Sequence, residues 1–154
     1  MILRVPTMKR AATLLVLTLG LASWTGVAQV PARQELSGER SRLHIAASQH
    51  EIIAILLNER QYDLIVGEFA KIVELGFTGD QERLLVEETW LVADQLRQAG
   101  QYQTGLEVID LSLHNTSLPE SQFALLMLKG KVLKDSGRIE EALSAYRRAQ
   151  RVRE

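Results

Sequence analysis

Residues 126 to 149 decide the fold, and they read Leu126-Met-Leu-Lys-Gly-Lys-Val-Leu-Lys-Asp-Ser-Gly-Arg-Ile-Glu-Glu-Ala-Leu-Ser-Ala-Tyr-Arg-Arg-Ala149. Within this stretch, small residues and one large residue recur at offsets of 7, 5, 4 and 3: Gly130, Gly137, Ala142, Tyr146 and Ala149. Two short helices that cross closely need small residues where their backbones meet, a glycine at the turn and a large side chain that fills the crossing. The stretch therefore predicts a helical hairpin that turns at Gly137.

The same pattern occurs once more, 37 residues earlier in the chain. Positions Ala93, Leu96, Gly100, Tyr102, Gly105, Ile109 and Ser112 correspond to Gly130, Leu133, Gly137, Ile139, Ala142, Tyr146 and Ala149. Both units resemble the tetratricopeptide repeat, a helix–turn–helix unit of 34 residues, with three extra residues in the loop before Pro119. The resemblance implies an all-α fold of antiparallel hairpins stacked as a short solenoid. An unrelated helical bundle is the alternative.

A third, weaker match covers residues 46–75. Tyr62 and Phe69 agree with the turn aromatic and the large crossing residue of the later units. Larger residues replace the expected small residues and the turn glycine at Ile53, Arg60 and Ile65. This segment is either a divergent repeat or a hairpin that only packs against the others.

Apolar residues at helical spacing predict six helices with short turns and no strand. The first four run over about 39–58, 62–75, 82–99 and 102–114, a fifth opens near Ser117 and a sixth follows Gly137. Thr78-Gly-Asp-Gln81 and Ser117-x-x-Glu120 fit capping boxes at the starts of the third and fifth helices. Ile52, Ile55 and Leu56 widen the apolar stripe of the first helix, so we expect that helix to be covered on more than one side.

The composition and the charge distribution limit the possible functions. A chain of 154 residues with 46% hydrophobic content can form one domain with a real core. No cysteine is present, which excludes disulfides, thiolate catalysis and cysteine-ligated metal. Residues 35–127 carry 15 acidic and 6 basic side chains, whereas residues 128–154 carry 4 acidic and 8 basic ones. The acidic body argues against a nucleic-acid partner.

The N-terminal 28 residues are typical of an export signal. A basic start, Met8-Lys9-Arg10, precedes the apolar run 11–21, and Gly26-Val-Ala28 offers a cleavage site. We expect a signal peptide over 1–28, a linker over 29–38 and a repeat domain over 39–154. This organisation predicts an exported protein, periplasmic or extracellular, of a bacterium. If residues 11–28 stay uncleaved, the alternative is a membrane-anchored subunit of a cell-envelope assembly.

In the tetratricopeptide family, ligands usually lie in a concave groove lined by the first helix of each hairpin. Carried onto this sequence, the resemblance places these residues in the groove: Glu87, Trp90, Asp94, Arg97, Met127, Lys131 and Lys134. An aromatic residue and a methionine among charges suit a peptide or protein ligand, with an apolar anchor and a polar rim. The alternative is that Trp90 belongs to the core and the charges are solvated surface.

No constellation for catalysis, a cofactor or a metal is present in the sequence. A phosphate-binding glycine loop, a nucleophile elbow and an HExxH motif are all missing. His44 and His50 lie six residues apart, on different sides of a helix. We therefore expect a non-enzymatic interaction module that needs neither cofactor nor metal. Repeats of this kind usually end in an extra capping helix, and none follows here before Glu154. Either the last helix is polar enough, as Arg147, Arg148, Arg151 and Arg153 suggest, or self-association covers this C-terminal end.

Overall fold

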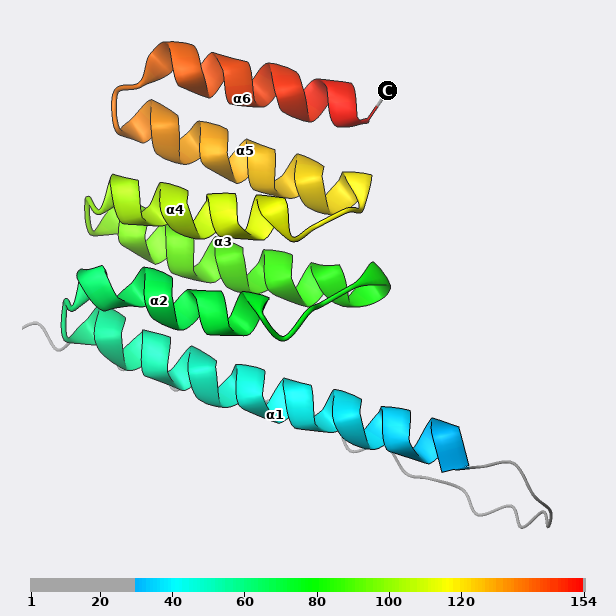
Figure 1. Ribbon diagram of the computed structural model, residues 1–154. Coiled ribbons are helices and arrows are strands. Elements are labelled where there is room, and N and C mark those ends of the chain that lie inside the picture. The colour runs from blue at the N-terminus through cyan, green and yellow to red at the C-terminus, as the bar shows by residue number, and fades with distance from the viewer. Residues whose placement is uncertain (1–29, 154) are drawn as a thin grey trace, which may run out of the picture.

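The computed structural model describes residues 30–153, with side chains from residue 38, and within this range it contains helices and no strand. The helices are α1 Val30–Asn58, α2 Tyr62–Val73, α3 Glu82–Gln98, α4 Tyr102–His114, α5 Pro119–Asp135 and α6 Ile139–Val152 (Figure 1). A short 3-10 helix, η1 Gly79–Gln81, leads into α3. The expected all-α class is confirmed.

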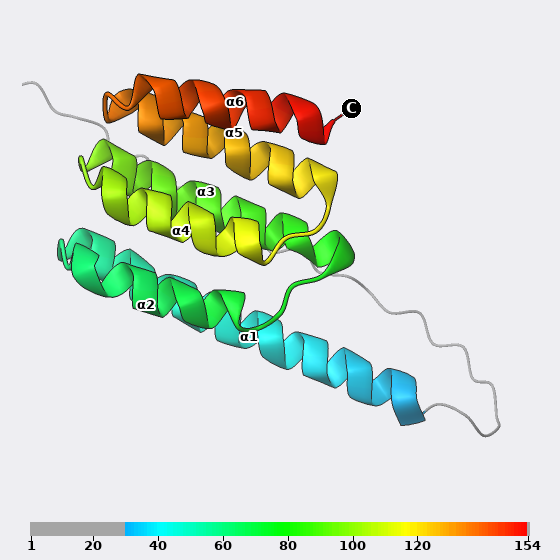
Figure 2. The ribbon, with the colours of Figure 1, turned by 45° about the horizontal axis from the view of Figure 1, so that its top comes forward.

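The helices pack as three consecutive hairpins. α1 lies against α2, α3 against α4, and α5 against α6, and the pairs follow one another in chain order (Figures 1 and 2). Between hairpins, α3 contacts both α1 and α5, while α4 contacts α2 and α5. The middle hairpin is therefore packed on both sides.

All three hairpins turn with one backbone geometry. The second residue after the first helix of each hairpin has a positive φ, 59° at Arg60, 75° at Gly100 and 81° at Gly137. The amide of that residue bonds the carbonyl three positions back, and the next amide bonds the carbonyl five positions back, as in a Schellman motif. The predicted turn at Gly137 is confirmed. The degenerate first segment, residues 46–75, shares the turn although it lacks the glycine.

Gly130 and Tyr146 form the predicted close crossing of α5 and α6. A Cβ added at Gly130 would lie 2.6 Å from Cζ of Tyr146, closer than real side chains approach. In the middle hairpin, the fully buried Ala93 and Ile109 occupy the corresponding positions. The small and large residues of the sequence pattern are thus found at the crossing of α5 and α6. Their counterparts are buried within the middle hairpin.

Two apolar clusters form the core, and the middle hairpin contributes to both. One cluster joins α1, α2 and the loop before α3 to the near face of α3 and α4, around Phe69 and Leu96. The other joins the far face of that hairpin to α5 and α6, around Ile109 and Leu128. A buried hydrogen bond of 2.6 Å between Thr89 and Ser112 ties α3 to α4 at the level between the clusters.

The N-terminus of α5 is capped from another hairpin. The carboxylate of Glu82, at the start of α3 and only 2% exposed, accepts hydrogen bonds from the Ser117 amide at 2.9 Å and the Leu118 amide at 3.0 Å. The Ser117 hydroxyl also donates to it, at 2.7 Å. The predicted capping boxes are wrong, because neither Thr78 nor the residue before α5 caps its helix through its own side chain.

Helix α1 differs from expectation in two ways. It begins at Val30, so residues 30–38, assigned to a linker, continue the helix. Good helix formers follow Pro31 there, and proline is tolerated in a first turn. The expectation that α1 is covered on several sides is wrong, since Ile52 and Ile55 are 42% and 59% exposed. One neighbouring layer is available to α1, and these side chains point away from it.

None of the helices between residues 30 and 153 is long and apolar enough to cross a membrane. The proposed signal, residues 1–28, lies outside the described residues.

Candidate functional site

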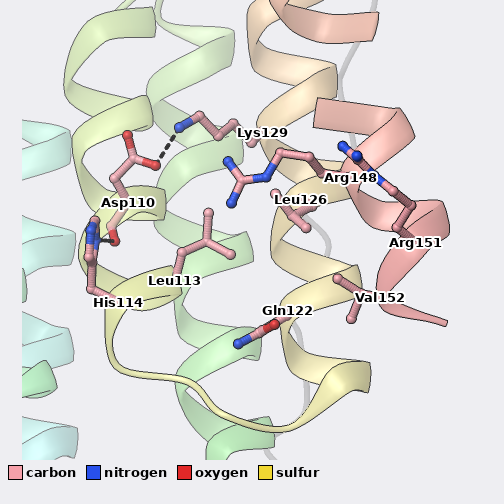
Figure 3. Close-up of a pocket in the computed structure, with 9 residues that line it drawn as sticks. All are labelled: Asp110, Leu113, His114, Gln122, Leu126, Lys129, Arg148, Arg151 and Val152. Carbon is pink, nitrogen blue, oxygen red and sulfur yellow. Dashed lines mark hydrogen bonds and ion pairs between the residues drawn. The ribbon is translucent and has the colours of Figure 1, made fainter. Parts of the chain in front are cut away.

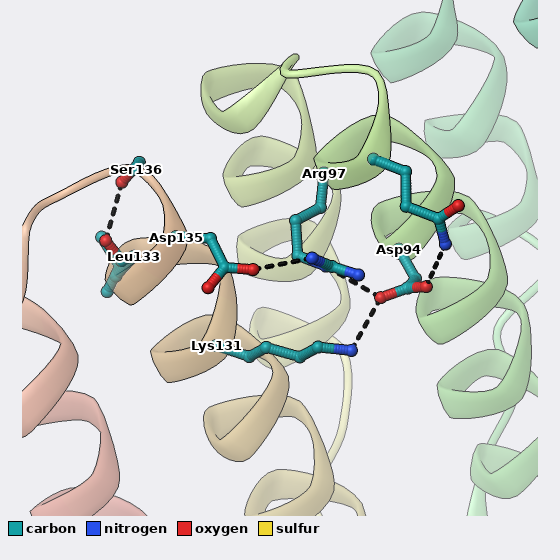
Figure 4. A network of polar contacts seen from close by, with 7 residues as sticks. Asp94, Arg97, Lys131, Leu133, Asp135 and Ser136 are labelled. Atoms are coloured by element: carbon teal, nitrogen blue, oxygen red, sulfur yellow. Dashed lines mark hydrogen bonds and ion pairs between the residues drawn. The ribbon is translucent and has the colours of Figure 1, made fainter.

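A network of charged side chains joins α3 to α5 on one face of the molecule. Asp94 accepts hydrogen bonds from Lys131 and Arg97, both at 2.9 Å, and from Gln98 at 2.6 Å. Arg97 also donates to Asp135 at 2.6 Å (Figure 4). Both cations are predicted groove residues, and they meet across two hairpins. The network fixes the separation of the two helices at this face.

The network also sets the charge states of its members. The hydrogen bond from Lys131, followed by that from Arg97, holds the pKa of Asp94 well below its ordinary range, although partial burial opposes them. Asp94, and then Asp135, raise the pKa of Arg97. Asp94 therefore stays ionised at any physiological pH, and the face presents fixed charges.

Trp90 lies beside this network at the surface. The Lys131 ammonium stands 5.5 Å from the centre of the indole ring, within reach of a cation–π contact. Trp90 is half-buried, and Met127, on α5, is 38% exposed. Trp90 also packs against the second apolar cluster, so one side of the ring contacts the core and the other side reaches the surface hollow. A partly exposed aromatic ring and an exposed methionine thus lie on the face that carries the charge network.

The remaining predicted residues occupy the margins of this face. Glu87 is exposed and pairs with Arg83 at 3.3 Å along α3. Lys134 is exposed and belongs to none of the ion pairs among the described residues. The structure thus brings Trp90, Asp94, Arg97 and Lys131 together and leaves Glu87 and Lys134 outside the network.

Two shallow hollows open on this side of the molecule. One, of about 390 Å³, lies between Trp90, Asp94 and Lys131. The other, of about 420 Å³, is an apolar groove between α1 and α3 that includes Leu43, Leu84 and Phe77. Glu87 and Leu91 line both hollows, so the two adjoin along α3. We call this combined surface the α3 groove.

Two exposed leucines line the α3 groove but are not among the predicted groove residues. Leu84 and Leu91 are 42% and 46% exposed. A signal was available, because Leu84 and Leu91 stand three residues before and four residues after Glu87, at the spacing of one helix face. An apolar residue on a predicted groove face can line the groove as readily as the core.

His50 on α1 contacts α3 across the apolar part of the α3 groove. Its Nδ1 lies 2.8 Å from a carboxylate oxygen of Glu88 on α3. His50 is half-buried, and this contact provides its ring nitrogen with a hydrogen-bond partner. Among residues 38–153, no three histidine, aspartate or glutamate side chains come together as a metal site.

No protein-family model, curated protein or solved structure matches this chain. The likeness to tetratricopeptide repeats therefore rests on the residues quoted from the sequence, and it stays a prediction.

Proposed function

We propose that this protein is a non-enzymatic interaction module of the tetratricopeptide type, which binds a peptide or protein segment in the α3 groove. One observation carries the proposal. Half-buried Trp90 and exposed Met127, from two successive hairpins, lie beside a charge network that bridges the same two helices. An exposed apolar centre with ordered charges around it is the composition of a protein-binding surface.

The network leaves hydrogen-bond donors for a ligand. Lys131 Nζ carries three N–H groups and uses one on Asp94, and Arg97 uses Nε and Nη1 and keeps Nη2. These donors suit backbone carbonyls or carboxylates of an extended segment, while Trp90 and Leu91 would take an apolar side chain. Because the protein side chains are already held by one another, binding orders few of them, and the entropic cost is low.

Peptide display tests this proposal: a peptide library is selected for binding to the full-length protein, and the affinities of the selected peptides are measured. We expect their affinity for a Trp90→Ala variant to fall at least about tenfold, since a central aromatic is usually a binding hot spot. A Leu143→Ala variant is the matched control, because Leu143 is an exposed apolar residue on α6, away from the α3 groove. Selected peptides that ignore Trp90→Ala would show that another surface binds them.

We further propose that residues 1–28 direct export and are removed. The mass of the protein isolated from its native host distinguishes the two candidate forms. A chain that begins at Gln29 supports the exported module, whereas retention of the apolar segment 11–28 supports the anchored subunit of an envelope assembly.

A further inference from the structure

A separate pocket opens between α4, α5 and α6 and shares no residue with the α3 groove. It measures about 540 Å³. Its apolar part is formed by Leu113, Leu126 and Val152, one from each helix (Figure 3). The lining also contains three cationic side chains, those of Lys129, Arg148 and Arg151.

The two arginines of the pocket are available to a ligand. Neither Arg148 nor Arg151 forms an ion pair with any described residue. Other arginines nearby are engaged, Arg138 with Glu141 at 2.5 Å and Arg153 over the Phe123 ring at 4.8 Å. Arg148 and Arg151 stand three residues apart on α6, which places them on one helix face.

The acidic part of the lining is already neutralised. The one carboxylate in the pocket, Asp110, pairs with Lys129 at 2.5 Å. Figure 3 shows Arg148 extended over the pocket between Lys129 and Leu126. Within residues 38–153 the two guanidinium groups thus have no carboxylate partner, and they stand beside an apolar floor.

We propose that this pocket binds an acidic peptide segment, with carboxylates on Arg148 and Arg151 and an apolar side chain on Leu113, Leu126 and Val152. Guanidinium groups bind carboxylates in a two-point geometry. An inorganic anion would pair with the arginines but leave the apolar floor exposed to water. A peptide with an apolar side chain would bind more tightly, because that side chain would bury the floor. The site is independent of the α3 groove and gives the module a second ligand.

Fluorescence anisotropy with the full chain tests this site. The probe is a fluorescein-labelled peptide of alternating pairs of glutamate and leucine. We expect Arg148→Glu to weaken its binding at least about tenfold, since a lost charge-assisted contact and a new repulsion both oppose it. Arg147→Glu is the matched control: it makes the same charge change at the adjacent exposed residue, which does not line the pocket. We expect a change smaller than about threefold there.

Two further probes define the ligand. A peptide with glutamine in place of glutamate should bind at least about tenfold more weakly, and so should one with alanine in place of leucine. Trp90→Ala should leave the affinity of the acidic peptide unchanged, so failure of the α3 groove and failure of this pocket are separable. Equal losses in Arg147→Glu and Arg148→Glu, or displacement of the peptide by millimolar inorganic phosphate, would overturn the proposal.

Discussion

Arg60 holds a left-handed backbone position that glycine holds in the other two hairpins, with a φ of 59°. The left-handed conformation costs a residue with a Cβ about 1–2 kcal/mol of steric strain. Glycine has no such strain, and its cost is the larger conformational entropy that it loses on folding. We expect Arg60→Gly to raise the free energy of unfolding by about 0.5–1 kcal/mol in urea denaturation. Gly137→Ala, with a φ of 81°, should lower it by about 1 kcal/mol. A destabilised Arg60→Gly protein would refute this reading of the turn.

Two buried glycines should respond to alanine with opposite signs. A Cβ at Gly105 would meet its nearest neighbours at 3.6 Å, which is ordinary contact, so Gly105→Ala should stabilise α4 by about 0.5–1 kcal/mol. At Gly130 the Tyr146 ring occupies the space, and Gly130→Ala should cost about 2 kcal/mol as α5 and α6 separate. Thermal unfolding of the two variants decides the point, and a cost at Gly105 or a gain at Gly130 would contradict it.

At the scale of single residues, the sequence predicted how side chains pack, but it predicted backbone conformation less well. Small residues opposite a tyrosine indicated the α5–α6 crossing, because few other arrangements use that combination. The left-handed turn at Arg60 gave no such signal, since arginine is compatible with many conformations and the hairpin imposes this one.

Helix α5 depends on a carboxylate from α3. Removal of Glu82 leaves the amides of Ser117 and Leu118 without an acceptor, so Glu82→Ala should lower the free energy of unfolding by about 2–4 kcal/mol at neutral pH. Glu120→Ala is the control, because Glu120 is exposed in the same first turn, and its cost should stay below about 0.5 kcal/mol. Faster hydrogen exchange at both amides of the Glu82→Ala protein would accompany the loss. Equal effects of the two variants would exclude this cap.

The stabilisation from Glu82 has a defined pH dependence. Burial raises the pKa of Glu82, but hydrogen bonds from Leu118 and Ser117 outweigh it and hold the pKa below the ordinary value. The unfolded chain therefore takes up the proton first as pH falls. The contribution is complete above the unfolded pKa of about 4.3 and is lost as pH falls through the folded value. The stability difference between wild type and Glu82→Ala should accordingly shrink in acid.

Local signals located the helices but not what fixes their ends. Turn glycines and apolar spacing predicted the starts at Tyr62 and Tyr102 and the end at His114. The capping boxes failed because Ser117 donates to Glu82, 35 positions away, and sequence spacing carries no record of a partner in another hairpin.

The whole molecule carries the two proposed binding surfaces, the α3 groove and the Arg148 pocket, on one helical framework. From the sequence alone, the family resemblance indicated Trp90, Asp94 and Lys131 of the α3 groove, and Arg97 in the charge network beside it. It did not indicate the Arg148 pocket, because that pocket combines residues from α4, α5 and α6 with no common spacing. The arginines had no distinguishing feature in a basic C-terminal segment. Arg148 and Arg151 are the arginines that line the pocket, and neither has an ion-pair partner among the described residues. Both properties are visible only in the three-dimensional structure.

Photo-crosslinking in the native host tests the central claim, that the α3 groove holds a protein or peptide partner, most directly. A benzophenone amino acid would replace Met127, which stands beside the α3 groove one helical turn before Lys131, or Leu64 on α2, both exposed apolar positions. We predict a discrete adduct from position 127 that disappears in the Trp90→Ala background, and none from position 64. The claim would be contradicted by adducts that form equally at both positions, or by an adduct at 127 that persists without Trp90.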